Sequence, residues 1–184
     1  MYTRALVFSD FKIAALDNAR RIIEFERSVG FFWEPKWQAW AIDSARELVI
    51  FFNWAYIITF WPIIAIVGVT LYVTNRGRYK YYRSIVLLSF VIALVGFMVF
   101  PLAPPRMIAE HFVDTIKVFG PSGYASREFA NYYNAYAAMP SLHFSWTVMF
   151  GVLFLTTPNK WIKVIGVIYP TMTLFAITIT GNHY

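Results

Sequence analysis

Long apolar runs alternate with short polar segments over most of the chain. The first two runs hold no ionisable side chain except tyrosine, and the last two hold one histidine each. They cover residues 48–74, 84–105, 129–159 and 164–184. A membrane-spanning helix needs about 20 apolar residues, whereas helices in soluble proteins average about 10–14. The pattern therefore predicts an all-α, polytopic transmembrane helical bundle. Its spans are predicted at about 48–74, 84–105, 138–157 and 164–181.

Residues 1–47 have a different pattern, because charges interrupt every apolar stretch and no signal peptide is recognisable. Between Phe11 and Val29 apolar residues recur at helical spacing, which is typical of an amphipathic helix. Trp33, Trp37 and Trp40 follow at intervals that place them on one helix face. We therefore expect an N-terminal amphipathic, interfacial helical segment before a bundle domain of residues 48–184. A simple membrane anchor and a lip beside the substrate both fit this segment.

Composition supports a membrane protein. Hydrophobic residues make up 59% of the 184 positions and charged residues 14%, against about 25% charged in ordinary soluble domains. The chain has no cysteine, which excludes disulfides, thiolate nucleophiles and zinc–thiolate sites. The net charge is +6, but it does not form a basic stripe on a polar surface. We therefore expect no nucleic-acid partner.

The excess positive charge lies in two short loops between apolar runs. Residues 75–83 carry four basic side chains, and residues 158–163 carry two; neither loop contains an acid. Residues 106–128 carry three basic and three acidic side chains. The positive-inside rule places the two basic loops in the cytoplasm and the neutral loop outside. A kink at Pro62 or a tilt would fit the long first run into a bilayer.

Three polar clusters at the outer ends of the predicted spans carry the candidate chemistry. Arg106 follows the second span, Ser141 and His143 begin the third, and His183 ends the fourth. An arginine and a helix N-terminus can bind phosphate oxygens, and two histidines can act as nucleophile and general acid. The topology brings these groups to one side of the membrane at similar depth, and polar residues at membrane depth are usually functional.

Each of these residues also has a structural interpretation. Either histidine can be a wetted structural residue, and Arg106 can snorkel or hold a lipid headgroup. Ser141 has the features of a helix N-cap, and the prolines can be simple helix stops. His111 lies among loop charges and is expected to be solvated. A metal site is not expected, because no carboxylate joins the histidines except in the outer loop.

Three motifs resemble those of the type 2 phosphatidic acid phosphatase superfamily. They are FPLAPPRM at 100–107, AMPSLHFSW at 138–146 and TGNHY at 180–184, preceded by an E-x-x-x-G-x-F-x-E-P-x-x-Q pattern at 26–38. Within that superfamily the chain is most similar to the branch of inositol phosphorylceramide synthases and their bacterial relatives. The segment Pro-Ser-Gly at 121–123 lacks a histidine and is a decoy for the second motif.

The resemblance implies a function and a role for each motif residue. His183 would be the nucleophile that forms a phosphohistidine, and His143 the general acid. Arg106 and Ser141, with Asn182, would bind the phosphoryl group. The implied enzyme is a lipid phosphatase or phosphotransferase without cofactor or metal. It would be integral to a bacterial cytoplasmic membrane, with an extracytoplasmic active site and lipid phosphates and membrane lipids as partners.

The chain departs from the superfamily pattern at three positions. Val99 and Ile177 stand where many members have a lysine and an arginine. The family's third motif also has an aspartate four residues after its histidine, which orients that ring, and the sequence ends at Tyr184. We expect the sequence to be part of a longer chain. The alternatives are a catalytically silent accessory subunit of a larger membrane complex and a lipid-binding protein.

Overall fold

A computed structural model describes residues 2–108, 110–120 and 136–183 of the chain. In these segments every named element is a helix, and the sole bridge is an isolated parallel pairing of Leu102 with Ala137. The all-α helical membrane bundle is therefore confirmed. The elements are α1 (Tyr2–Ser28), α2 (Glu34–Ser44), α3 (Arg46–Ile58), α4 (Phe60–Thr74), α5 (Arg76–Val99), the 3-10 helix η1 (Pro105–Met107), α6 (Thr115–Phe119), α8 (Leu142–Leu155) and α9 (Lys160–Ile179).

Two of the described helices, α5 and α9, are each long and apolar enough to cross a membrane. The pair α3 and α4 meets the same test as one broken span, and α8 is a shorter apolar helix of 14 residues. The helix bounds differ from the predicted spans for local reasons. Helix α5 already begins at Arg76, because the Asn75 side chain caps it and the basic residues continue the helix. Helix α8 begins only at Leu142, because Pro140 and the capping Ser141 precede it.

The first apolar run is broken near its middle. Helices α3 and α4 meet at Thr59 with a bend of 43°. Pro62 has no backbone N–H to give to the Ile58 carbonyl, which weakens the helix at this turn. The bend directs α3 toward one end of the bundle, and it places Tyr56 and Phe60 on either side of the break.

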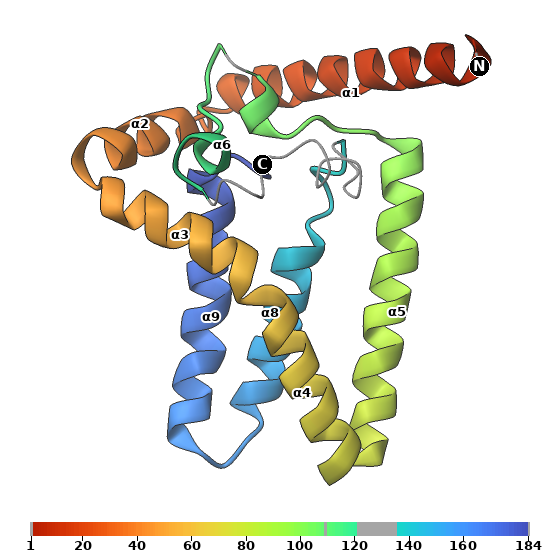
Figure 1. The fold of residues 1–184 in the computed structure, drawn as a ribbon, viewed down its shortest axis with the longest axis vertical. Coiled ribbons are helices and arrows are strands. Elements are labelled where there is room, and N and C mark those ends of the chain that lie inside the picture. The colour runs from red at the N-terminus through yellow and green to blue at the C-terminus, as the bar shows by residue number, and fades with distance from the viewer. Residues whose placement is uncertain (1, 109, 121–135, 184) are drawn as a thin grey trace.

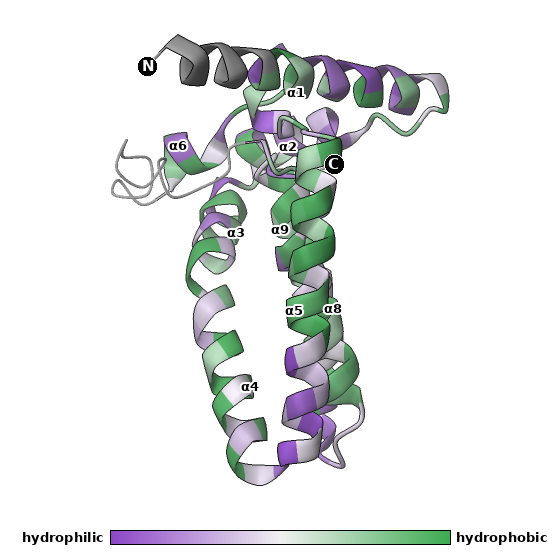
Figure 2. Ribbon diagram, turned by 90° about the vertical axis from the view of Figure 1, so that its right-hand side faces the viewer, coloured by the Kyte–Doolittle hydropathy of each residue, from purple (hydrophilic) through white to green (hydrophobic). Residues whose placement is uncertain are grey.

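Helices α4, α5, α8 and α9 run along the long axis of the molecule, and α1 crosses one end of it (Figure 1). The α4–α5 and α8–α9 connections both lie at the opposite end (Figure 1). The basic residues of segments 75–83 and 158–163 lie in the first turns of α5 and α9, next to these connections. Both basic segments therefore share one end, as the predicted topology requires. Green apolar colour covers the middle of α5 and α9, with purple at the far end of α5 and along α1 (Figure 2).

Helices α8 and α9 form the closest pair in the bundle. Gly151 of α8 faces Gly166 of α9, and a Cβ atom added at Gly151 would lie 2.6 Å from the Gly166 carbonyl oxygen. The missing side chains therefore let the two backbones touch. A buried cluster that includes Phe60, Trp146 and Phe150 connects α8 to α4. This packing sets where the N-terminus of α8 and the C-terminus of α9 lie.

Helix α1 packs across the segment that follows α5. Its buried face is Ala15, Ala19 and Ile23, which contact Leu102 and Ala103. The Ala103 N–H donates to the Ala15 carbonyl at 3.1 Å, and Asn18 donates to the Pro101 carbonyl at 2.9 Å. The amphipathic N-terminal helix thus holds the backbone that carries Arg106.

Candidate functional site

The candidate residues gather at the end of the bundle that α1 covers. Arg106 lies in η1, Ser141 and His143 begin α8, and His183 follows α9. The backbone N–H of Arg106 donates to the Gly181 carbonyl at 2.8 Å, which joins the first and third motifs. Gly181 has φ +64°, a conformation that a side chain disfavours, and an added Cβ would lie 3.3 Å from the Arg106 nitrogen. Glycine at 181 therefore permits the close approach.

The second motif joins this site through a short backbone pairing. The Leu102 N–H donates to the Tyr136 carbonyl at 3.0 Å, and the Ala138 N–H donates to the Leu102 carbonyl at 3.2 Å. The carbonyl of Ala138 then lies 2.6 Å from Nδ1 of His183. All three motifs are therefore connected by backbone hydrogen bonds that involve residues within or beside them.

His183 has a defined orientation and tautomer. A carbonyl oxygen only accepts hydrogen bonds, so Nδ1 of His183 carries the proton given to Ala138. In the neutral ring this leaves Nε2 with its lone pair, which is the atom a nucleophile needs. Burial lowers the pKa of His183 from 6.5 to about 4; the hydrogen bond to Ala138 raises it, and the charge of Arg106 lowers it. The ring is therefore neutral near pH 7.

Arg106 is held by two side chains. Its Nη1 donates to Oδ1 of Asn182, and its Nε lies 3.9 Å from a carboxylate oxygen of Asp114. The Asn182 amide also donates to Oγ1 of Thr180 at 2.6 Å. With 24% of its side chain exposed, Arg106 can still meet a ligand. Both the oxygen and the nitrogen of the Asn182 amide therefore have hydrogen-bond partners, and the oxygen helps to position Arg106.

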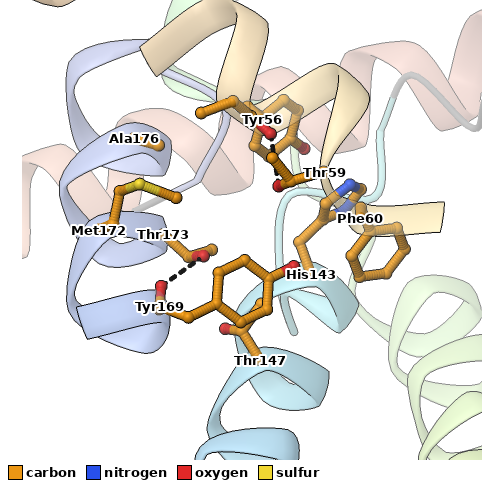
Figure 3. Close-up of a pocket in the computed structure, with 10 residues that line it drawn as sticks. Tyr56, Thr59, Phe60, His143, Thr147, Tyr169, Met172, Thr173 and Ala176 are labelled. Carbon is orange, nitrogen blue, oxygen red and sulfur yellow. Dashed lines mark hydrogen bonds between the residues drawn. The ribbon is translucent and has the colours of Figure 1, made fainter. Parts of the chain in front are cut away.

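His143 lies in the first turn of α8, against aromatic rings. Its ring stacks on Phe60 at 3.8 Å and on Tyr56 at 4.4 Å between centroids. Tyr56, Phe60 and His143 also border a small cavity between α3, α4, α8 and α9. The centre of a water molecule can occupy about 10 Å³ of it, which is room for about one water molecule. Thr59, Thr147 and Tyr169 also line it, so polar side chains form part of its wall beside apolar ones such as Met172 (Figure 3).

Ser141 is the N-cap of α8. Its Oγ accepts the Phe144 N–H at 3.2 Å, which satisfies one of the free donors of the first turn. The capping interpretation of this residue is thus observed. A hydroxyl that accepts this bond keeps its own proton, so Ser141 can still donate to a ligand oxygen.

Two buried amides, which sequence reasoning did not assign to the site, position Asp114. Gln38 accepts the Val113 N–H at 2.7 Å and donates to the Val113 and Ile179 carbonyls. Asn53 donates to the Thr115 carbonyl at 2.9 Å. Both are fully enclosed, and they fix the residues on either side of Asp114. Asn53 could have been identified from the sequence, because it is an isolated polar residue within an apolar run.

Tyr56 is another residue near the site that the sequence analysis did not identify. Its hydroxyl oxygen lies 3.5 Å from Nε2 of His183 while its ring stacks on His143. Tyr56 thus contacts both candidate histidines. The signal was weak, because a tyrosine inside a predicted span reads as one more aromatic residue.

His111 does not join the site. Its Nε2 lies 2.8 Å from Nη2 of Arg27, and its ring packs edge-on against Phe32. His111 is half-exposed, so it keeps contact with solvent as expected, and Arg27 and Phe32 are its neighbours. The segment 121–123 and Glu128 lie outside the described residues. Within the described residues no group of three or more metal-ligating side chains occurs; that the reaction needs no metal stays a prediction.

A family model described as the PAP2 superfamily, the type 2 phosphatidic acid phosphatases, matches residues 20–184. That range includes all three connected motifs. The chain belongs to the PAP2 superfamily. PAP2 membership supports a phosphatase-type activity on lipid phosphates in general and an association with membranes. Comparison with curated proteins and with solved structures gives no significant match.

Two residues depart from the usual PAP2 pattern, Val99 and Ile177, and they lie in different surroundings. Val99, at the end of α5, is 78% exposed. Ile177 on α9 is 4% exposed and lies in the helical core. Arg106 is therefore the motif cation that lies beside His183 in the described residues.

Proposed function

We propose that the protein is a membrane lipid phosphatase or phosphotransferase that works through a phosphohistidine on His183. The observation that carries this proposal is the setting of the His183 ring. Its Nδ1 is tied to the Ala138 carbonyl, and Nε2 faces Tyr56, whose ring stacks on His143. A half-buried, neutral and oriented imidazole beside an arginine has the properties of a nucleophile for phosphate.

The residues divide the reaction between them. Arg106 binds two phosphoryl oxygens with its planar fork, and the Ser141 hydroxyl donates to another. Nε2 of His183 attacks phosphorus, and the bond to the leaving oxygen breaks as His143 protonates that oxygen. In the second half-reaction His143 removes a proton from the acceptor, which attacks phosphorus and releases His183.

Water as acceptor makes the protein a phosphatase, and a second alcohol makes it a phosphotransferase. With an alcohol as acceptor, a phosphate monoester such as phosphatidic acid gives a new phosphomonoester. A phosphodiester donor, which the resemblance to inositol phosphorylceramide synthases implies, gives a new phosphodiester. The substrate enters from the bilayer, so its apolar tail stays among the helices. By the loop charges, the site faces the extracytoplasmic side of the membrane.

The experiment compares His183→Gln with His111→Gln in the purified chain in detergent micelles. The substrate is phosphatidic acid carrying ³²P, with and without an added lipid alcohol. Wild type and His111→Gln should release or transfer labelled phosphate at rates within about twofold, because His111 pairs with Arg27 away from the site. His183→Gln should lose turnover by more than about 10³-fold and form no acid-labile phosphoprotein.

Turnover that survives in His183→Gln would contradict the phosphohistidine. Salt-sensitive binding of phosphatidic acid by wild type without any turnover would favour a lipid-binding protein. Neither binding nor turnover would favour the accessory subunit of a membrane complex.

A further inference from the structure

Tyr56 lies between the two histidines of the site. It belongs to the last turn of α3, and the bend at Thr59 follows it directly. Its hydroxyl oxygen is 3.5 Å from Nε2 of His183, and its ring centroid is 4.4 Å from that of His143. The PAP2 motifs around residues 106, 143 and 183 do not include this position.

The protonation of Nδ1 of His183 determines which group donates the hydrogen bond between Tyr56 and His183. Nδ1 carries the proton given to the Ala138 carbonyl, so Nε2 of the neutral ring is an acceptor. The Tyr56 hydroxyl is therefore the donor toward Nε2. A separation of 3.5 Å is long for this bond, as is common for catalytic groups before substrate binds.

The ring of Tyr56 has a separate role at His143. His143 lies at 21° to the Tyr56 plane and at 23° to the Phe60 plane, so both rings stack on the imidazole. The face of an aromatic ring attracts a cation. Tyr56 and Phe60 can therefore favour the imidazolium that must form before His143 protonates a leaving oxygen.

We propose that Tyr56 is a third catalytic residue, an inference that rests on the phosphoryl transfer proposed for His183. In the resting site its hydroxyl donates to Nε2. When Nε2 attacks phosphorus, its lone pair becomes the N–P bond, and the Tyr56 hydroxyl turns to donate to a phosphoryl oxygen. Tyr56 forms and breaks no covalent bond and keeps its proton throughout, so it stabilises the negative charge of the transition state.

Two substitutions separate the hydroxyl from the ring. Tyr56→Phe keeps the stacking and removes the donor, and we expect kcat for phosphatidic acid to fall about 10- to 100-fold, the range for one hydrogen bond to a charged group. KM should change less than about threefold, since the bond strengthens in the transition state. Tyr56→Leu also removes the ring, and its pH–rate profile should shift because His143 has lost a stacking partner.

Tyr169→Phe is the matched control. Tyr169 lines the same cavity, and no contact with either histidine is among its described interactions. Its kcat should stay within about twofold of wild type. The melting temperatures of Tyr56→Phe and Tyr169→Phe should agree within 1–2 °C or so, which separates a catalytic effect from a loss of fold.

A Tyr56→Phe variant with wild-type kcat, measured beside an inactive His183→Gln, would overturn the role of Tyr56 and leave the proposed function intact. Turnover in His183→Gln would instead contradict the proposed function itself. A second measurement does not depend on turnover: the ¹⁵N shift of His183 Nε2 should change in Tyr56→Phe as the accepted hydrogen bond is lost. An unchanged shift would overturn the contact.

Discussion

The protonation state of His183 is set by neighbours on separate segments. The Ala138 carbonyl accepts from Nδ1, Arg106 adds a positive charge nearby, and burial disfavours an imidazolium. Burial and the arginine lower the pKa of the ring, and the hydrogen bond opposes them in part. The outcome is a neutral ring whose Nε2 is available near pH 7, so no base is needed to activate it.

A histidine titration checks this arrangement. In wild type, NMR of ¹³C-histidine protein in micelles should give a midpoint near pH 4 for His183, assigned by the signal that His183→Gln lacks. Arg106→Gln removes the positive charge, so the pKa of His183 should rise. Lys117→Gln, an exposed cation on α6, is the control for net charge. A wild-type midpoint above pH 6 would contradict the buried, neutral nucleophile.

Glu26 provides a second titration, at the turn between α1 and α2. One carboxyl oxygen each of Glu26 and Glu34 is buried without a hydrogen-bond partner. Burial, and then the charge of Glu34, raise the pKa of Glu26 from 4.5 to about 7. The folded chain therefore binds more protons than the unfolded chain between these pH values, and this part of the stability is lost as pH rises through 7.

Glu26→Gln should remove that dependence. We expect the variant to gain melting temperature relative to wild type at pH 8 and to gain much less at pH 5, where Glu26 is already protonated in the folded state. Scanning fluorimetry of the tryptophans at the two pH values measures this. Glu24→Gln, on the exposed face of α1, controls for the lost charge. Equal gains at pH 5 and pH 8 would argue against a protonated Glu26.

At the scale of elements, the contact of α8 with α9 decides whether the two histidines meet. His143 lies in the first turn of α8, and His183 lies four residues beyond the end of α9. Both helices run to the same end of the molecule from a short connection, and the Gly151–Gly166 contact sets their spacing. A change in this spacing therefore moves one histidine relative to the other.

Gly151→Ala tests the spacing. The new Cβ would lie 2.6 Å from the Gly166 carbonyl oxygen and 2.7 Å from Pro170 Cγ, so the helices must separate. We expect roughly 1–3 kcal/mol of destabilisation, typical of overpacking, and a lower kcat, since a displacement of about 1 Å can cost about 10²-fold. Thermal unfolding and phosphate release measure the two effects.

Gly68→Ala on α4 is the matched control, because nothing lies within 4 Å of its added Cβ. Alanine in a helix interior is favoured over glycine by up to about 1 kcal/mol, so this variant should be as stable as wild type or more stable. If Gly151→Ala matched Gly68→Ala in stability and turnover, the close helix contact would have no role.

At the scale of the whole molecule, the bundle has one basic end and one end that holds the site. The α4–α5 and α8–α9 connections share the basic end, and α1, α2 and the C-terminus share the other (Figure 1). The positive-inside rule predicts that the basic end lies in the cytoplasm and that the candidate site faces outward.

Single-cysteine variants test this orientation directly, because these 184 residues contain no cysteine. A membrane-impermeant maleimide added to intact cells should label Glu110→Cys, in the exposed segment after η1, and should leave Arg78→Cys on α5 unlabelled. Arg78→Cys should become reactive after the cells are permeabilised. The reverse pattern would place the site in the cytoplasm.

The sequence alone determined the class of fold and indicated most of the candidate site residues. A helix that crosses a bilayer needs about 20 consecutive apolar residues. This requirement applies to one segment at a time, so it can be recognised in the sequence without knowledge of tertiary contacts. The sequence also indicated Arg106, His143 and His183, because polar groups at membrane depth stand out against apolar neighbours. Helix bounds were less accurate, since caps and prolines such as Asn75 and Pro140 set them residue by residue.

Tertiary structure alone decided which groups act on the histidines. The contact of Ala138 with His183 spans 45 residues and that of Tyr56 spans 127, so no pattern along the chain reveals either. A backbone carbonyl has no signature in a sequence, and a tyrosine in an apolar run resembles any other aromatic residue. These contacts exist because the bend at Thr59 and the glycine contact of α8 with α9 bring distant segments together, which depends on packing in three dimensions.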